Sequence, residues 1–223
     1  MVFLKVKLPR DNIYLILWIS VYLPYYYTAM SQYPKAKFIQ SANNSSQFVP
    51  DTGAEVCFVG RSNSGKSSAI NVIVNRRQFA KTSKTPGRTQ LINFFMLANE
   101  KRLVDLPGYG FALVSRSKKN HWKEILSQYF EERNTLMGIF LIVDIRRGIT
   151  NYDLDMLFLS KIHEISVHIL LTKSDKLKRG AASKKLLELK SSLDKSISIQ
   201  LFSSLNRQGV DEARTVLDKF LES

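Results

Sequence analysis

The sequence predicts an α/β protein with a doubly wound, mostly parallel six-stranded sheet flanked by helices. Three observations predict this fold. Strand-like apolar runs alternate with helical patterns along the chain. Several runs are continuously apolar, as strands buried on both faces require. A glycine-rich loop follows the first of these runs and precedes a helix, which is the order of a phosphate-binding loop. With 223 residues and 44% hydrophobic content, the chain can form one sizeable core.

The six predicted strands are residues 55–59, 91–97, 102–105, 138–144, 167–172 and 198–202. Apolar side chains recur at helical spacing in two further segments, and we interpret both stripes as core packing. The first stripe is Leu154, Leu157, Phe158, Ile162 and Ile165, and the second is Val210, Ala213, Leu217 and Phe220.

The loop after the first strand reads G-x-x-x-x-G-K-S, and its residues are Gly60, Arg61, Ser62, Asn63, Ser64, Gly65, Lys66 and Ser67. Glycines let the backbone wrap closely around an anion, so that successive N–H groups and the helix N-terminus point at phosphate. Lys66 is expected to reach the β- and γ-phosphates, and the Ser67 hydroxyl to ligate Mg²⁺. We therefore predict a nucleotide-binding loop.

Two further sequences follow predicted strands. The first, D-x-x-G, comprises Asp105, Leu106, Pro107 and Gly108, where the carboxylate can hold Mg²⁺ through water and the glycine amide can sense the γ-phosphate. The second comprises Thr172, Lys173, Ser174 and Asp175. The Asp175 carboxylate can accept hydrogen bonds from N1–H and N2–H₂ of guanine, which adenine lacks, and the Lys173 stem would lie over the purine. Each of these two sequences is a weak signal alone. Together with the phosphate-binding loop they make three motifs in order, each at the end of a predicted strand, which indicates a guanine-nucleotide site.

The chain resembles the EngB GTPases (also called YihA or YsxC) of the Era/EngA-like class. The resemblance covers residues 35–221 and is carried by K-T-S-K-T-P-G-R-T-Q-L-I-N-F-F at residues 81–95 and V-D-L-P-G-Y-G-F-A at residues 104–112. It is most specific over residues 82–112. It implies that Thr89 ligates Mg²⁺ and touches the γ-phosphate, which makes Lys66, Thr89 and Gly108 the expected catalytic residues and Ser67, Thr89 and Asp105 the metal ligands. It also adds two groups of nucleotide-contacting residues: Gly87, Arg88, Thr89, Gln90 and Leu91, and then Phe202, Ser203 and Ser204.

Three positions qualify the expected chemistry. Thr172 stands where asparagine is commoner in GTPases, and its shorter side chain is expected to weaken the link between the base-reading loop and the phosphate loop. Tyr109 stands where many GTPases carry a water-orienting glutamine, which predicts slow intrinsic hydrolysis. By resemblance, Asn63 can help hold K⁺ beside the phosphates, and the other interpretation is a hydrogen bond within the loop. Nucleotide-dependent switch loops are expected at residues 79–88 and 109–119.

The domain prediction separates residues 1–29, a lead-in at 30–50 and the GTPase domain at 51–223. A basic segment precedes a short apolar run at residues 13–23, which Pro24 ends. We favour a dispensable extension with translation starting at Met30, and the alternatives are a membrane-associating segment and a secretion signal. A single cysteine, Cys57, excludes intrachain disulfides and fits a reducing compartment, so we predict a cytoplasmic protein.

The net charge of +14 is the remaining signal. No acidic residue lies between Glu55 and Glu100, where the cations are Arg61, Lys66, Arg76, Arg77, Lys81, Lys84 and Arg88. A second cluster comprises Lys173, Lys176, Lys178, Arg179, Lys184 and Lys185. One GTP cannot pair with all of these cations, so the surface fits a nucleic acid that is recognised through its backbone charge. The simpler interpretation is a basic surface that binds no partner and only increases solubility.

Two functional hypotheses follow. In the favoured one, a GTP-hydrolysing switch docks on RNA or protein of the large ribosomal subunit during its assembly, and the resemblance implies a requirement in cell division and septation. This hypothesis predicts a monomer with no DNA partner and no stable membrane association. In the alternative, a basic membrane- or division-site binding module is regulated by guanine nucleotide.

Overall fold

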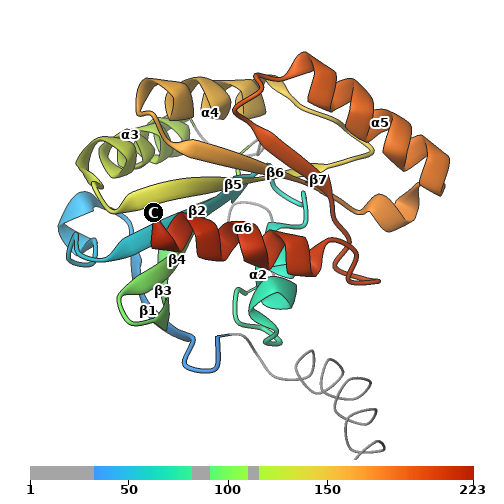
Figure 1. Ribbon diagram of the computed structural model, residues 1–223. Helices are drawn as coiled ribbons and strands as arrows, with labels where there is room; N and C mark the ends of the chain where they lie inside the picture. Colours follow the sequence, from blue (N-terminus) through green and yellow to red (C-terminus); the bar gives the residue numbers. More distant parts are fainter. Residues whose placement is uncertain (1–32, 82–90, 110–115) are drawn as a thin grey trace, which may run out of the picture.

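The computed structural model describes the backbone of residues 33–81, 91–109 and 116–223, and the side chains of these residues except 116–120 and 122. It shows a seven-stranded sheet in the order β1-β3-β4-β2-β5-β6-β7, with helices on both faces (Figure 1). The central pairs β4–β2, β2–β5, β5–β6 and β6–β7 are parallel, and β1 and β4 run antiparallel to β3. The predicted doubly wound, mostly parallel α/β fold is confirmed.

The strands are β1 (Lys37–Ala42), β2 (Ala54–Gly60), β3 (Ile92–Ala98), β4 (Lys101–Asp105), β5 (Leu136–Asp144), β6 (Ser166–Thr172) and β7 (Ser198–Leu201). The helices are α2 (Lys66–Val74), α3 (Arg116–Glu132), α4 (Asn151–Ile162), α5 (Arg179–Ser192) and α6 (Val210–Glu222), with short 3₁₀ turns η1 (Ser45–Gln47) and η2 (Ser174–Lys176). Residues 116–119, predicted as loop, form the first turn of α3.

The seventh strand corrects the prediction of six. β1 comes from the segment assigned to a lead-in, and it pairs with β3 from Lys37 opposite Met96 to Ala42 opposite Ile92. Its sequence carries a weak strand signal because β1 is an edge strand on which only Ala42 is buried. Just before it, the buried Tyr33 donates a hydrogen bond from its hydroxyl to the Asp218 carboxylate of α6 at 2.7 Å. The lead-in therefore contributes to the sheet and contacts the last helix.

Helices α2 and α6 cover one face of the sheet, and α3, α4 and α5 cover the other (Figure 1). The core on the α2 and α6 side includes Phe58, Ile70 and Leu217, and the opposite core includes Cys57, Tyr129 and Ile169. Because β2, β5 and β6 lie between the two cores, they are buried along nearly their whole length. The described residues contain no helix that is both long and apolar enough to cross a bilayer.

One predicted stripe faces the core and the other does so only in part, because Leu157 and Ile165 pack against the core. In α6, Val210, Ala213 and Leu217 are buried as predicted. In α4, the prediction of core packing is wrong for three residues: Leu154, Phe158 and Ile162 are 51%, 66% and 57% exposed. The buried face of α4 is instead Asp153, Met156 and Ser160. Burial of Asp153, whose contacts are described below, turns these three exposed residues outward.

A buried ionic cluster anchors the amino end of β2. The fully buried Glu55 carboxylate accepts hydrogen bonds from Arg102 of β4 at 2.7 Å, from the Tyr129 hydroxyl at 3.1 Å and from Arg133. Arg133 also donates to the Val49 carbonyl at 2.7 Å. A buried carboxylate is tolerated only when its partners are this complete. The cluster fixes the strand whose other end leads into the phosphate loop.

Candidate functional site

The phosphate loop, residues 60–67, connects the end of β2 to the start of α2. Gly65 precedes the helix with φ of 101°, in the left-handed region that favours glycine, and its carbonyl accepts the first helical hydrogen bond from the Ala69 amide at 2.8 Å. At Gly60, a Cβ would lie 2.5 Å from the Ile142 carbonyl oxygen, so glycine is needed there for close packing. The first turn of α2 contains no acidic residue, and its N-terminus is therefore suited to bind phosphate.

The D-x-x-G segment lies directly against this loop. Asp105 ends β4 opposite Phe58 of β2, and its carboxylate pairs with the Lys66 ammonium. The amide of Ser62 donates to the Tyr109 carbonyl at 2.9 Å, and the Tyr109 amide donates to the Gly60 carbonyl at 3.3 Å. A Cβ at Gly108 would lie 3.3 Å from both the Gly60 oxygen and the Ser62 nitrogen. The structure thus brings Gly108 and Asp105 against the phosphate loop, whereas Thr89 lies outside the described residues.

The Tyr109 side chain is directed into the protein. It is 3% exposed, and its hydroxyl donates a hydrogen bond to the Asp153 carboxylate. The other oxygen of Asp153 accepts from the Thr150 amide at 2.7 Å and caps α4. Burial, and then the charge of Asp153, raise the pKa of Tyr109 far above its usual range, so that the phenol stays protonated and remains a donor. Tyr109 therefore ties the segment after Gly108 to α4.

The expected guanine-reading residues gather at the ends of β6 and β7. The Ser203 hydroxyl donates to the Asp175 carboxylate at 2.6 Å, and Lys176 pairs with the other carboxylate oxygen at 3.2 Å. The hydrogen bond from Ser203 is the main cause that lowers the pKa of Asp175, which stays ionised as base recognition requires. Phe202 is fully buried, and its carbonyl accepts from the Ser174 hydroxyl at 3.0 Å. Ser204 is half-buried beside them.

A direct contact joins this base-reading region to the phosphate loop. The Thr172 hydroxyl donates to the Ser64 carbonyl at 2.5 Å, and the Lys173 ammonium donates to the Asn63 carbonyl at 2.7 Å. Sequence reasoning expected the shorter Thr172 side chain to weaken this link, and the structure shows that its hydroxyl still reaches the loop. Its short side chain suffices because β6 ends close to the loop. A Cβ placed on Gly65 of the loop would lie only 3.5 Å from Thr172 Oγ1.

Asp144, at the end of β5, is a site residue whose position sequence reasoning did not identify. Its buried carboxylate pairs with the Lys173 ammonium at 3.0 Å and with the Arg146 guanidinium at 2.7 Å. Burial alone would raise the pKa of Asp144, but hydrogen bonds from Arg146 and Lys173 lower it well below its usual range. Asp144 thereby holds Lys173 over the loop. The sequence signal that could have identified Asp144 was its position at the carboxyl end of a predicted strand, where the other site residues also lie.

Part of the predicted site lies outside the described residues: Gly87, Arg88, Thr89 and Gln90, together with most of both predicted switch loops. Leu91 is described, and it is exposed immediately before β3.

Comparison with known proteins agrees with this geometry. The sequence profile of a family described as "50S ribosome-binding GTPase" matches residues 55–173. A Hydrogenovibrio crunogenus protein named "Probable GTP-binding protein EngB" is 51% identical over 193 residues, which are 85% of this chain and 91% of that protein. The Coxiella burnetii protein of the same name is 46% identical over 194 residues, or 86% of this chain and 95% of that protein. The chain belongs to the EngB family of GTP-binding proteins.

Solved structures support the fold. The crystal structure of a probable GTP-binding protein EngB aligns with a TM-score of 0.62 and 21% identity over 76% of this chain and 99% of that one. Aquifex aeolicus Era bound to GDP and AlF₄⁻ aligns with a TM-score of 0.58 and 23% identity over 74% of this chain and 56% of that chain. Family membership makes the chain a guanine-nucleotide-binding GTPase.

Asp175→Asn tests the base-reading assignment. The new amide presents a donor to a donor edge of guanine, so GTP and GDP affinity should fall about 100-fold, and affinity for xanthine nucleotides should rise because their 2-oxo group accepts from the amide. Titration of each nucleotide measures both changes. Asp194→Asn, which alters a turn carboxylate bound to Ser196, is the matched control and should leave affinity unchanged. Equal affinity of the unaltered chain for ATP and GTP would contradict the assignment.

Proposed function

We propose that this chain is a slow, Mg²⁺-dependent GTP-hydrolysing switch that acts in the cytoplasm in assembly of the large ribosomal subunit, and that normal cell division and septation require it. The observation that carries the proposal is the joined site, in which the phosphate loop, Asp105 and Asp175 meet at one edge of the sheet. The family description as ribosome-binding and the net charge of +14 support the ribosomal partner.

The residues present fit Mg²⁺. A hydroxyl at Ser67 and a carboxylate at Asp105 are the hard oxygen donors that this ion prefers, and Thr89 would add a second hydroxyl. When bound, Mg²⁺ would neutralise charge on the β- and γ-phosphates. Lys66, which pairs with Asp105 in this structure, would turn to the phosphate oxygens and leave the Asp105 carboxylate for the metal.

Slow hydrolysis follows from the position of Tyr109. Its hydroxyl is engaged with Asp153, and its ring lies 5.9 Å from that of Tyr152. A phenol held in this way cannot accept and donate to an attacking water as a glutamine amide does. A positive charge beside the phosphates would compensate in part for the missing glutamine. Asn63, which has φ of 63° and lies in the exposed turn of the loop, is where K⁺ would be held.

GTP hydrolysis should therefore be faster in K⁺ than in Na⁺ at equal ionic strength. The gain should stay below the ~100-fold that a dedicated charge-stabilising donor supplies. Phosphate release is measured in the two salts for the unaltered chain and for Asn63→Ala. The exposed and distant Asn44→Ala serves as the control. Asn63→Ala should abolish the K⁺ effect and the control should keep it. Identical rates in both salts for the unaltered chain would dispose of the K⁺ site.

Association with large ribosomal subunits should depend on salt and on nucleotide. Each neutralised phosphate releases condensed counterion, so affinity should fall about tenfold or more between 50 and 200 mM salt. A GTP analogue should favour binding over GDP, because the Gly108 amide and Thr89 can respond only to a γ-phosphate. Pelleting with subunits across a salt series measures both effects, and Lys66→Ala should remove the nucleotide effect. Binding that changes with neither salt nor nucleotide would refute the proposed switch. Binding to vesicles in place of subunits would favour a membrane-binding module.

A further inference from the structure

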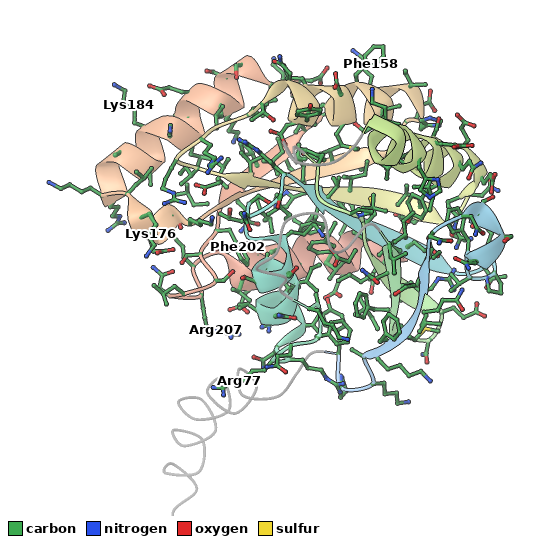
Figure 2. All side chains as sticks on the ribbon, turned by 180° about the vertical axis from the view of Figure 1, so that it is seen from behind. Arg77, Phe158, Lys176, Lys184, Phe202 and Arg207 are labelled. Carbon is green, nitrogen blue, oxygen red and sulfur yellow. The ribbon has the colours of Figure 1, made fainter. Side chains whose placement is uncertain are left out.

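Exposed cations line one edge of the molecule beside the base-reading residues. In Figure 2 the side chains of Lys184, Lys176, Arg207 and Arg77 follow one another down this edge. They come from α5, from η2, from the loop before α6 and from the turn that follows α2, and all four are exposed. We name these four residues the basic edge. Segments far apart in the sequence thus present one row of positive charge.

Little acidic charge interrupts this row. Between Thr172 and Leu187 the only acidic residue is Asp175, which is engaged with Ser203 and Lys176. Glu188, on the next turn of α5, lies 3.9 Å from Lys184 as an exposed pair that contributes little. An elongated row of cations is complementary in charge to a nucleic-acid backbone.

The chemistry of the edge favours RNA over a membrane. A membrane-seated surface needs several apolar side chains between its cations. In α5 and the 203–208 loop, only Leu187 and Leu205 are large apolar side chains with strong exposure. No aromatic side chain is exposed in these two segments, so stacking on bases is not available and recognition would fall to phosphate contacts.

One residue of the basic edge also touches the guanine-reading carboxylate. The Lys176 ammonium lies 3.2 Å from an Asp175 oxygen, and its side chain is 53% exposed. The N1–H and N2–H₂ donors of guanine would approach the two Asp175 oxygens, and Lys176 already engages one of them. The ammonium charge makes that oxygen a weaker acceptor for the base. The opposite oxygen accepts from Ser203, whose hydroxyl in turn accepts from the Leu205 and Asn206 amides beside Arg207. The edge and the base pocket therefore share side chains.

We propose that the basic edge docks the RNA backbone of the large ribosomal subunit, and that an RNA phosphate which engages Lys176 releases Asp175 to guanine. The inference rests on the proposed function and adds the docking surface and its regulation. Since coupling between two binding sites is reciprocal, RNA strengthens guanine-nucleotide binding and guanine nucleotide strengthens RNA binding by the same factor. This coupling acts at the base and is independent of the γ-phosphate.

Release of labelled GDP from the full chain tests the coupling, with an RNA duplex of about 20 base pairs as the probe. The duplex should slow release about two- to fivefold, the range expected for relief of one partly exposed ion pair. Lys176→Gln should slow release by a similar factor without RNA, should bind the duplex more weakly, and should no longer respond to it. Lys184→Gln is the matched control from the same edge. It should bind the duplex more weakly, release GDP as the unaltered chain does, and still respond at saturating duplex.

Three results would overturn the inference. In the first, GDP release from the Lys176→Gln chain still responds to the duplex. In the second, neither substitution lowers the affinity for the duplex. In the third, the chain binds anionic vesicles but not the duplex.

Pelleting the same chains with large subunits separates this inference from the proposed function. If the unaltered chain pellets and both substituted chains pellet equally well, the docking surface lies elsewhere and the switch stands. If the unaltered chain pellets in no nucleotide state, the ribosomal function itself fails.

Discussion

The contact between the end of β6 and the phosphate loop is the constraint on which the rest of the site depends. Thr172 and Ser64 are 108 positions apart in the chain, yet a 2.5 Å hydrogen bond joins the side chain of one to the carbonyl of the other. Lys173 repeats the connection at the neighbouring carbonyl of Asn63. A nucleotide that must satisfy both Asp175 and Lys66 binds well only if these residues are already held at a fixed separation, because ordering them on binding would cost free energy.

The parallel sheet makes that contact possible. β2, β5 and β6 are neighbours with their carboxyl ends at one edge, so the phosphate loop, Asp144 and Thr172 emerge side by side. Asp144 in the middle adds electrostatic support by pairing with Lys173. At the opposite end of β2, the buried Glu55 with its two arginines prevents the strand from shifting in register. The site is thus held from both ends of its central strands.

Local sequence patterns predicted the fold and indicated the candidate site because each pattern depends on interactions between residues close together in the chain. A continuously apolar run, a G-x-x-x-x-G-K-S loop and a strand-end carboxylate each signal their role within about ten residues. β1 was missed because an edge strand buries only one residue and so lacks that pattern. The stripe of α4 was misread because the orientation of this helix depends on a distant partner, Tyr109, which buries Asp153. Asp144 and Thr172 gained their roles only through contacts across the sheet.

Nucleotide affinity of Thr172→Val tests the central claim most directly. Valine keeps the shape of threonine and removes only the hydroxyl that reaches the Ser64 and Val143 carbonyls, so the loops lose the more buried of their two links while the core stays filled. Loss of one buried hydrogen bond should weaken GDP and GTP binding alike by about tenfold, with guanine still preferred over adenine. Calorimetric titration of both nucleotides, with the melting temperature of the free chain measured alongside, separates this effect from unfolding. Unchanged affinity in a folded Thr172→Val chain would show that nucleotide binding does not depend on the contact between Thr172 and Ser64, which contradicts the central claim.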